Sequence, residues 1–117
     1  MMPRFTMDEL AAATGGIILR RGRRKTVEGV FIDSRRVAPG ALFVPIVGRR
    51  HDAHAFIPQA LKRGAAAVLA ERDRLPARVL EAAGDAWVIG VKDSTHALGE
   101  LAAHHRRRFD IPLVAVT

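Results

Sequence analysis

The chain has 117 residues, which is enough for one domain with a core of its own, and it contains no cysteine, so disulfide bonds and thiolate metal sites are excluded. Lys and Arg total 19 against 12 Asp and Glu, an excess that attracts nucleic acid, acidic lipid or a phosphorylated small molecule. Arg supplies 16 of the 19, and the Ala-rich, Lys-poor composition allows genomic bias as an alternative cause. No run approaches the ~20 apolar residues of a membrane span, and Asp8 and Glu9 interrupt the apolar core of a signal peptide. We therefore expect a soluble, cytoplasmic protein with no membrane partner.

The first half of the chain predicts one helix followed by strands. Residues 7–13 have helical spacing, with Thr6 as candidate N-cap and Gly15-Gly16 at the end. Strands are expected at residues 16–20, 27–33 and 41–47, with a charged turn at 20–26. Pro45 lies inside the third of these strands, which argues for an edge position or a bulge there because proline cannot donate to a sheet ladder.

After residue 40, helices and strands alternate. Helices are expected within residues 51–64, at 77–83 and from 94 to 109, and strands at 65–71, 86–91 and 113–117. Pro58 fits the first turn of the first helix and Gly64 its end, and Asp93 or Ser94 is expected to cap the last helix before Pro112 breaks the pattern. The inward stripe of that helix is expected to comprise Leu98, Leu101, Ala102, His105 and Phe109. The alternation predicts an α/β fold with some parallel strand pairing.

Two polar bends interrupt the apolar runs at either end of the 41–47 strand. Residues 33–36 read Asp-Ser-Arg-Arg, and residues 48–54 read Gly-Arg-Arg-His-Asp-Ala-His. Each bend carries two adjacent arginines, whose guanidinium groups match phosphate geometry. Loops on a rigid scaffold often carry binding residues. The bends therefore predict one shared pocket for an anionic ligand, with two solvated turns as the alternative.

Other patterns in the sequence are weaker. The basic run at residues 20–25 could bind nucleic acid, but it has no interleaved aromatic residue, and a solvated turn is the simpler reading. The pair His51 and His54 with Asp52 could bind zinc, although a closed site needs four ligands. His96, His104 and His105 are spread along the last predicted helix. No complete glycine-rich phosphate loop and no assignable catalytic triad is present, so we expect neither catalytic residues nor a metal site.

The combined pattern from "DSRR" to "AAAVLAE" resembles the N-terminal region of the Mur ligases, which extend peptidoglycan precursors. The matching pieces are Asp33-Ser34-Arg35, Pro39-Gly40, Leu42-Phe43-Val44, Gly48, Asp52-Ala53-His54, Phe56-Ile57 and Gly64-Ala65. Each piece alone is weak, but the combination is specific and the similarity covers nearly the whole chain. The one departure is Ala53, where the family usually has glycine. Residues 94–117 resemble the segment that leads to the family's ATP-binding loop, so that Thr117 precedes the expected loop.

The resemblance implies a division of the chain. Residues 1–91 would form the small mixed-sheet domain that binds the uridine diphosphate end of the precursor. Residues 92–117 would contribute the first helix and strand of a P-loop-type, parallel-sheet ATP-binding domain, and the buried character of 113–117 also predicts that the sheet continues beyond it. By matching position, Ile32 and Ser34 lie where the uracil is held, and Arg49, Arg50 and His51 lie in the loop that approaches the diphosphate.

Within the family, the stretch "LAAHHRRRFDIPLVAVT" is most similar to the ligase that adds D-alanyl-D-alanine to UDP-N-acetylmuramoyl-tripeptide. The ligase that adds the third amino acid is the alternative within the family, and a basic nucleic-acid-binding module is the alternative from another class. The resemblance implies that the parent enzyme uses ATP and magnesium to form an acyl phosphate, acts as a monomer and has no nucleic-acid partner. The 117 residues alone are expected to be inactive and to bind neither cofactor.

Overall fold

A computed structural model describes residues 2–108 and Leu113. The strands are β1 (Arg4–Thr6), β2 (Ile17–Arg20), β3 (Thr26–Glu28), β4 (Val30–Phe31), β5 (Leu42–Phe43), β6 (Ala67–Glu71) and β7 (Trp87–Val91). The α-helices are α1 (Met7–Thr14), α2 (Ile57–Lys62), α3 (Ala77–Ala82) and α4 (Ser94–Arg108). Three short 3-10 helices, η1 (Ser34–Arg36), η2 (Ala53–Phe56) and η3 (Arg72–Arg74), lie in the connections.

The main sheet has five strands in the order β2-β7-β6-β5-β4. The pairs β4–β5, β5–β6 and β6–β7 are parallel, whereas β2 pairs antiparallel with β7 at one edge. The strands β1 and β3 form a separate antiparallel pair. The predicted α/β class with a mixed sheet is therefore confirmed.

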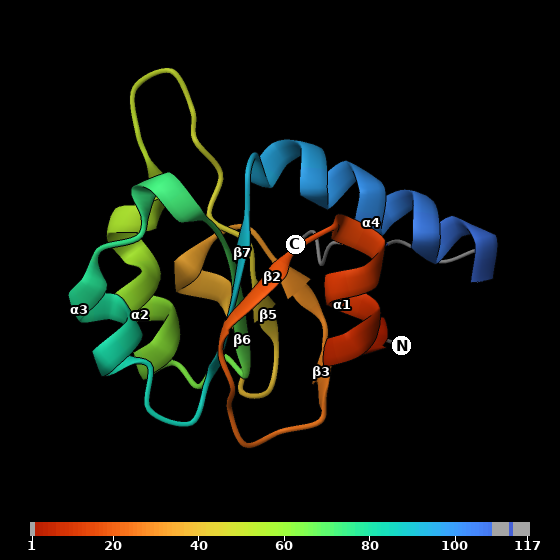
Figure 1. Cartoon of the computed structure of the whole chain (residues 1–117), viewed down its shortest axis with the longest axis horizontal. Coiled ribbons are helices and arrows are strands. Elements are labelled where there is room, and N and C mark those ends of the chain that lie inside the picture. The colour runs from red at the N-terminus through yellow and green to blue at the C-terminus, as the bar shows by residue number, and fades with distance from the viewer. Residues whose placement is uncertain (1, 109–112, 114–117) are drawn as a thin grey trace.

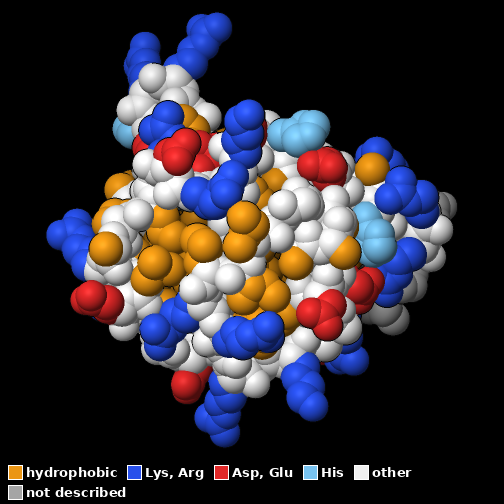
Figure 2. Space-filling view, viewed as in Figure 1, with side chains coloured by type: hydrophobic (Ala, Val, Ile, Leu, Met, Phe, Trp, Pro, Cys, Tyr) orange, Lys and Arg blue, Asp and Glu red, His pale blue; other side chains and the backbone are white. Residues whose placement is uncertain are grey.

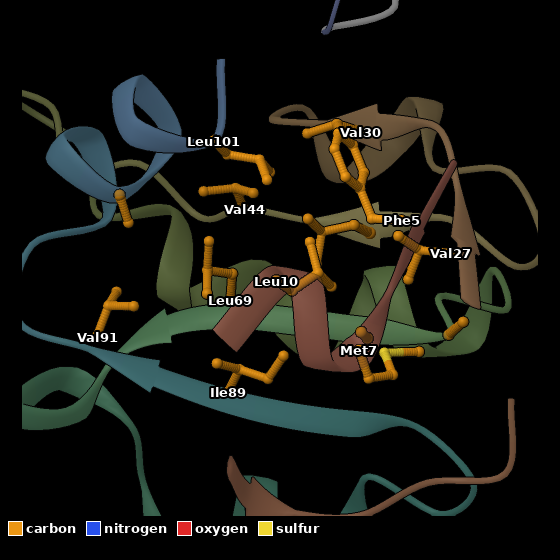
Figure 3. Close-up of a cluster of buried hydrophobic side chains, with 14 of the residues drawn as sticks. Phe5, Met7, Leu10, Val27, Val30, Val44, Leu69, Ile89, Val91 and Leu101 are labelled. Carbon is orange, nitrogen blue, oxygen red and sulfur yellow. The ribbon is translucent and has the colours of Figure 1, made fainter. Parts of the chain in front are cut away.

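Helices cover both faces of the sheet. On one face, α1 and α4 pack over a core that includes Phe5, Leu10, Leu69 and Leu101 (Figure 3). On the other face, α2 and α3 cover a second cluster that includes Phe43. Successive residues of one strand point to opposite faces, so β6 contributes to both clusters. Likewise β7 contributes Ile89 and Val91 to the first cluster, and Val88 to a small third cluster with Ala83 and Ala86.

The two longer helices begin as their sequences predict. Thr6 is the N-cap of α1, where its hydroxyl accepts from the Glu9 N–H at 3.0 Å while the Glu9 carboxylate accepts from the Thr6 N–H at 3.0 Å. Gly15 closes α1 in the left-handed conformation, with φ 68°. At α4, the Asp93 carboxylate accepts from the His96 N–H at 3.0 Å. These local signals fixed both helix starts.

The stripe predicted for α4 is confirmed within the described residues. Leu101 and His105 are buried, and Leu98 and Ala102 pack partly buried against the same core. The predictions for Phe109, Pro112 and the strand at residues 113–117 fall outside the described residues, except that Leu113 is buried. The helix α4 packs beside α1 (Figure 1). The expected domain boundary at residue 91 stays a prediction.

The single strand expected at residues 27–33 is wrong in extent. Gly29 has φ 88°, a left-handed conformation that glycine adopts readily, and it separates β3 from β4. As a result β3 pairs with β1 while β4 joins the main sheet. The chain then leaves β4 at Ile32 and enters the first polar bend.

The strand expected at residues 41–47 is also shorter than predicted, and its edge position is wrong. The strand β5 lies inside the sheet, between β4 and β6. It ends at Phe43, and Pro45 lies just beyond it. Because Pro45 has no N–H to donate, the ladder cannot continue through it, so proline ends an internal strand here instead of marking an edge.

The strand at the antiparallel edge, β2, leaves apolar side chains uncovered. Ile17 and Leu19 are both exposed, and hydrophobic side chains gather on this face of the molecule (Figure 2).

Within residues 2–108, no helix has the length and apolar character needed to cross a membrane.

Candidate nucleotide pocket

The two polar bends line one pocket of about 480 Å³, a volume in the range of small-molecule sites. The first bend contributes Ile32, Asp33, Ser34 and Arg35, the second contributes His51 and Ala53, and the start of α2 with the preceding η2 contributes Phe56 and Gln59. The bends meet because β4 and β5 are adjacent and parallel, so the segments leaving them emerge at the same edge of the sheet. The two bends therefore share one pocket, although Arg35 is the only one of their four arginines in its lining, and its use for an anionic ligand stays a prediction.

The first bend is held by its own side chains. The Asp33 carboxylate accepts from the Arg35 N–H at 3.0 Å, which starts the short helix η1. The Arg35 guanidinium donates twice to the same carboxylate, at 3.0 and 2.9 Å. These hydrogen bonds from Arg35 lower the pKa of Asp33 to about 2. Arg35 is thus already paired, which reduces its availability to a ligand.

Ser34 faces the pocket from a nearly buried position. Ser34 is only 6% exposed, and its hydroxyl donates to the Gln59 side-chain oxygen at 2.6 Å. Gln59 lies on α2, so this hydrogen bond joins the first bend to the helix that follows the second bend. The Gln59 amide nitrogen keeps its two donors for other partners. The pocket lining therefore includes a hydrogen-bonded polar pair from two chain segments.

Two exposed apolar side chains, Ile32 and Phe56, line the same pocket. Ile32 is 43% exposed and Phe56 is 48% exposed. Large apolar side chains left open to solvent beside convergent polar groups are typical of ligand sites. The lining thus combines apolar surface with hydrogen-bonding groups.

The second bend is a tight hairpin that projects from the body of the molecule, at the top of Figure 1. Val47 and Asp52 form an isolated antiparallel bridge, and the Gly48 N–H donates to the His51 carbonyl at 2.8 Å. Arg49 and Arg50 occupy the exposed turn, and basic side chains project there in Figure 2. The structure thus brings Ile32, Ser34 and His51 into one lining, with the two arginines on the adjoining hairpin.

A polar network around the buried ring of His54 anchors the base of this hairpin. The His54 ring is 4% exposed, its Nδ1 lies 2.6 Å from the Asp52 carboxylate, and its Nε2 accepts from the Glu71 N–H at 2.9 Å. Arg74 donates to both Asp52 and Glu71, at 3.0 and 3.1 Å. Glu71 also accepts from the N–H and hydroxyl of Ser94 at the start of α4, at 2.9 and 3.1 Å.

The network sets the charge of Asp52. Burial by itself raises the pKa of this carboxyl, but hydrogen bonds from the His54 N–H, the His54 ring and Arg74 outweigh it, and the pKa is lowered overall. The hydrogen bond to Asp52 raises the pKa of Arg74. Both groups therefore remain charged near neutral pH.

The zinc alternative for His51 and His54 does not match this arrangement. Both ring nitrogens of buried His54 already have protein partners, while His51 is exposed. Among residues 2–108 and 113, no group of three or more His, Asp or Glu lies together as a metal site requires.

The basic run at residues 20–25 is partly occupied within the fold. Arg20 donates to the carbonyls of Leu80 and Gly84, at 2.9 and 2.8 Å, and so binds the end of α3. The Arg21 guanidinium lies 5.6 Å from the centre of the Trp87 ring. These contacts give two of the five basic residues in the run a structural use, which weakens the nucleic-acid alternative.

A second groove of about 520 Å³ lies between α2 and α3. Leu61, Val79 and Ala83 make its lining mostly apolar, and none of the motif residues matched to the Mur ligases lies in it. Although this groove is slightly larger, the pocket between the bends has five polar side chains in its lining (Asp33, Ser34, Arg35, His51 and Gln59) against three in the groove (Lys62, Arg78 and Asp85), and it is the better candidate site.

Sequence reasoning missed the contribution of α2. Phe56 and Gln59 line the pocket although neither was singled out as a binding residue. A signal existed, because a large aromatic residue just before a proline-initiated helix and a polar residue three positions later share one helical face. Asp33, Arg35 and Ala53 complete the lining.

Comparison with known families decides the relationship. The family model described as "Mur ligase family, catalytic domain" matches residues 26–106, most of the chain. This chain belongs to the Mur ligase family. Both polar bends and all of α2 lie inside the matched range.

Individual Mur ligases of two kinds are similar to it. The UDP-N-acetylmuramoyl-L-alanyl-D-glutamate–2,6-diaminopimelate ligase of Syntrophomonas wolfei is 42% identical over 95 residues, which cover 80% of this chain and 18% of that protein. The UDP-N-acetylmuramoyl-tripeptide–D-alanyl-D-alanine ligase of Escherichia coli is 37% identical over 112 residues, covering 96% of this chain and 23% of that protein. The chain thus spans about a fifth of the length of these curated relatives.

The fold matches a solved Mur ligase as well. The crystal structure of MurF from Acinetobacter baumannii superposes with a TM-score of 0.77 at 27% sequence identity, covering 92% of this chain and 22% of that chain. The expected family and mixed-sheet fold are thereby confirmed.

Proposed function

We propose that this chain is the N-terminal, precursor-binding part of an ATP-dependent Mur ligase, and that its pocket holds the uridine diphosphate end of the substrate. Family membership, the similarity to MurF and the shared lining of the two bends support the proposal. The observation that carries it is the single pocket into which Ile32, Ser34 and His51 converge from separate segments.

The uracil ring is proposed to lie between Ile32 and Phe56. Both side chains are exposed and apolar, as contact with the faces of a heterocycle requires. The edge of uracil carries carbonyl acceptors and one N–H donor, which the Gln59 amide and the Ser34 hydroxyl can complement. A purine presents a larger ring and a different pattern of donors and acceptors, so discrimination against adenine is expected.

The diphosphate is proposed to lie toward the hairpin. Arg49, Arg50 and His51 are exposed there, and guanidinium groups bind phosphate oxygens through paired hydrogen bonds. Arg35 contributes less because Asp33 already occupies its guanidinium. The pocket is thus proposed to hold the base of the ligand, and the hairpin is proposed to hold its diphosphate.

The reaction of the parent enzyme is proposed to be the addition of D-alanyl-D-alanine to UDP-N-acetylmuramoyl-tripeptide. The E. coli relative carries that name, and the structural match is to MurF. The alternative is addition of the third residue, which the name of the S. wolfei relative supports. Assaying the protein that carries this chain with D-alanyl-D-alanine and with diaminopimelate separates the two reactions.

The proposed parent draws on ATP and magnesium to activate the substrate carboxylate as an acyl phosphate. Residues 1–117 contain no complete glycine-rich phosphate loop, so we assign no residue here to ATP or to the metal. The part played by this chain is to bind and orient the nucleotide end of the precursor. On its own it is expected to ligate nothing.

The direct test is an equilibrium titration of the 117-residue chain with UDP and, separately, with ADP. The proposal predicts saturable binding of UDP and clearly weaker binding of ADP. Equal affinity for both nucleotides would contradict uracil recognition, because shared phosphate contacts alone explain such a result.

A further inference from the structure

We infer that Arg74 is a positioning residue, which acts through Asp52 to hold the hairpin at residues 47–52 against the pocket and so sets the affinity for the phosphate end of the ligand. The inference rests on the proposed function, because the phosphate end is assigned there to the hairpin. Nothing in the resemblance or in the family comparison assigns a role to Arg74, which lies outside all the matched motif pieces.

The hairpin has few contacts that could hold it by themselves. Its base is joined by the Val47–Asp52 bridge and by the Ala53 N–H, which donates to the Ile46 carbonyl at 3.1 Å. Its turn residues are exposed. A two-stranded ribbon this short is not stable alone, so its orientation depends on anchors to the body of the domain.

Asp52 is such an anchor, and it stands between two residues that line the pocket, His51 and Ala53. One carboxylate oxygen accepts from the main-chain N–H and the ring of His54, and the other accepts from Arg74 at 3.0 Å. Because the ring of His54 is fixed to the end of β6 by the Glu71 N–H, Asp52 is tied to the sheet by two separate routes.

Arg74 provides the second route. Its Nε donates to Glu71 at 3.1 Å while its Nη1 donates to Asp52, so one guanidinium spans the end of β6 and the base of the hairpin. The side chain is 47% exposed, which means that replacing it leaves no cavity in the core. A variant at this position can therefore change the hairpin while the rest of the fold remains intact.

Two possible roles of Arg74 predict opposite effects of Asp52→Asn on the affinity for UDP. If Arg74 only offsets the negative charge of Asp52, removing that charge by Asp52→Asn should strengthen the binding of UDP, which is an anion. If Arg74 positions the hairpin through Asp52, the same substitution weakens the anchor and should lower UDP affinity. We expect the second result, because the carboxylate accepts three hydrogen bonds that an amide cannot all accept.

The test compares Arg74→Gln and Asp52→Asn with the unmodified chain, using UDP and uridine as probes. Both variants are expected to bind UDP about three- to tenfold more weakly, the loss that corresponds to one ordinary hydrogen bond, because Arg74 is 47% exposed and solvent weakens its ion pairs. Uridine has no phosphate, so its affinity should stay within about twofold of that of the unmodified chain. Arg78→Gln is the matched control, because Arg78 is exposed on α3 and lines the other groove. Arg78→Gln should change neither the affinity for UDP nor the affinity for uridine.

A second measurement needs no ligand. Backbone ¹⁵N order parameters at residues 48–51 are expected to fall in both variants and to stay unchanged in Arg78→Gln. Tighter UDP binding by Asp52→Asn, equal losses for UDP and uridine, or unchanged order parameters would each overturn the inference. If the unmodified chain does not bind UDP more tightly than ADP, the proposed function is wrong, and so is the part of the inference that concerns UDP affinity. Lowered order parameters in the two variants would still establish that Arg74 and Asp52 anchor the hairpin.

Discussion

The buried imidazole of His54 accepts a hydrogen bond from the main-chain N–H of Glu71, over 2.9 Å. Because this donor points at Nε2, the ring proton lies on Nδ1, 2.6 Å from the Asp52 carboxylate. A residue that sequence spacing offers as a metal ligand is therefore a structural link between the end of β6 and the base of the hairpin.

Replacing His54 with alanine should destabilise the domain by about 2–4 kcal/mol, because it leaves the Glu71 N–H and part of the Asp52 carboxylate without partners and opens a cavity. Urea unfolding measures the change. His96→Ala is the control, since His96 is exposed on α4 and its pairing with Glu100 is at the surface. That variant should lie within about 0.5 kcal/mol of the unmodified chain, and a similar loss in both would contradict the role given to His54.

Ser34→Ala should weaken UDP binding about three- to tenfold, because a hydroxyl in the pocket lining is lost. The stability change should stay below about 1.5 kcal/mol, since the exposed Gln59 side chain can bond to water instead. Calorimetric titration and thermal unfolding give the two numbers. Thr14→Val is the control, because the Thr14 hydroxyl is also buried but donates to the Leu10 carbonyl at 2.6 Å within α1, away from the pocket lining and from the network at the hairpin base, so its UDP affinity should be unchanged. A large loss of stability with unchanged affinity in Ser34→Ala would make the first bend a structural turn.

Arg50→Ala should lower the affinity for UDP but not for uridine, and the difference should shrink as salt is raised, because an exposed guanidinium acts on phosphate through a screened interaction. The melting temperature should remain close to that of the unmodified chain. Arg107→Ala removes another exposed arginine, from α4, and serves as the charge-matched control. If both variants lose the same affinity, only the net positive charge of the chain matters and the hairpin has no specific role.

The pH dependence of stability should carry the signature of Asp33. Its folded pKa is about 2, below the ordinary value of 3.8, so its stabilising contribution is fully present above about pH 4 and is lost as the pH falls through about 2. The difference in unfolding free energy between the unmodified chain and Asp33→Asn should thus be constant from pH 7 to about 4 and diminish below it. A difference that grows toward acid pH would contradict the pairing of Asp33 with Arg35.

Local signals in the sequence predicted much of the fold. Thr6 and Gly15 determine the ends of α1 through groups next to them in the chain, so no knowledge of the tertiary structure was needed. Gly29 and Pro45 show where such reasoning fails. Either residue can occur in a strand when the neighbouring strands are not known. Only the observed strand order shows that Gly29 separates strands of two different sheets and that Pro45 ends an internal strand.

The sequence predicted the site residues of the two bends better than those of η2 and α2. Ser34 and His51 stand out because they interrupt apolar runs, whereas Phe56 and Gln59 sit in an ordinary helical pattern. Their contribution depends on the angle at which α2 packs against η1, which long-range contacts determine. The same holds for Arg74, whose two carboxylate partners are separated from each other by 19 positions of sequence.

The pocket between the two bends is proposed to hold a pyrimidine ring. Intermolecular nuclear Overhauser effects in the UDP-bound chain would show whether it does. We predict contacts from the uracil H5 and H6 protons to the Ile32 methyl groups and the Phe56 ring. Contacts from those protons to Leu61 and Val79 in the α2–α3 groove, with none to Ile32 or Phe56, would contradict it.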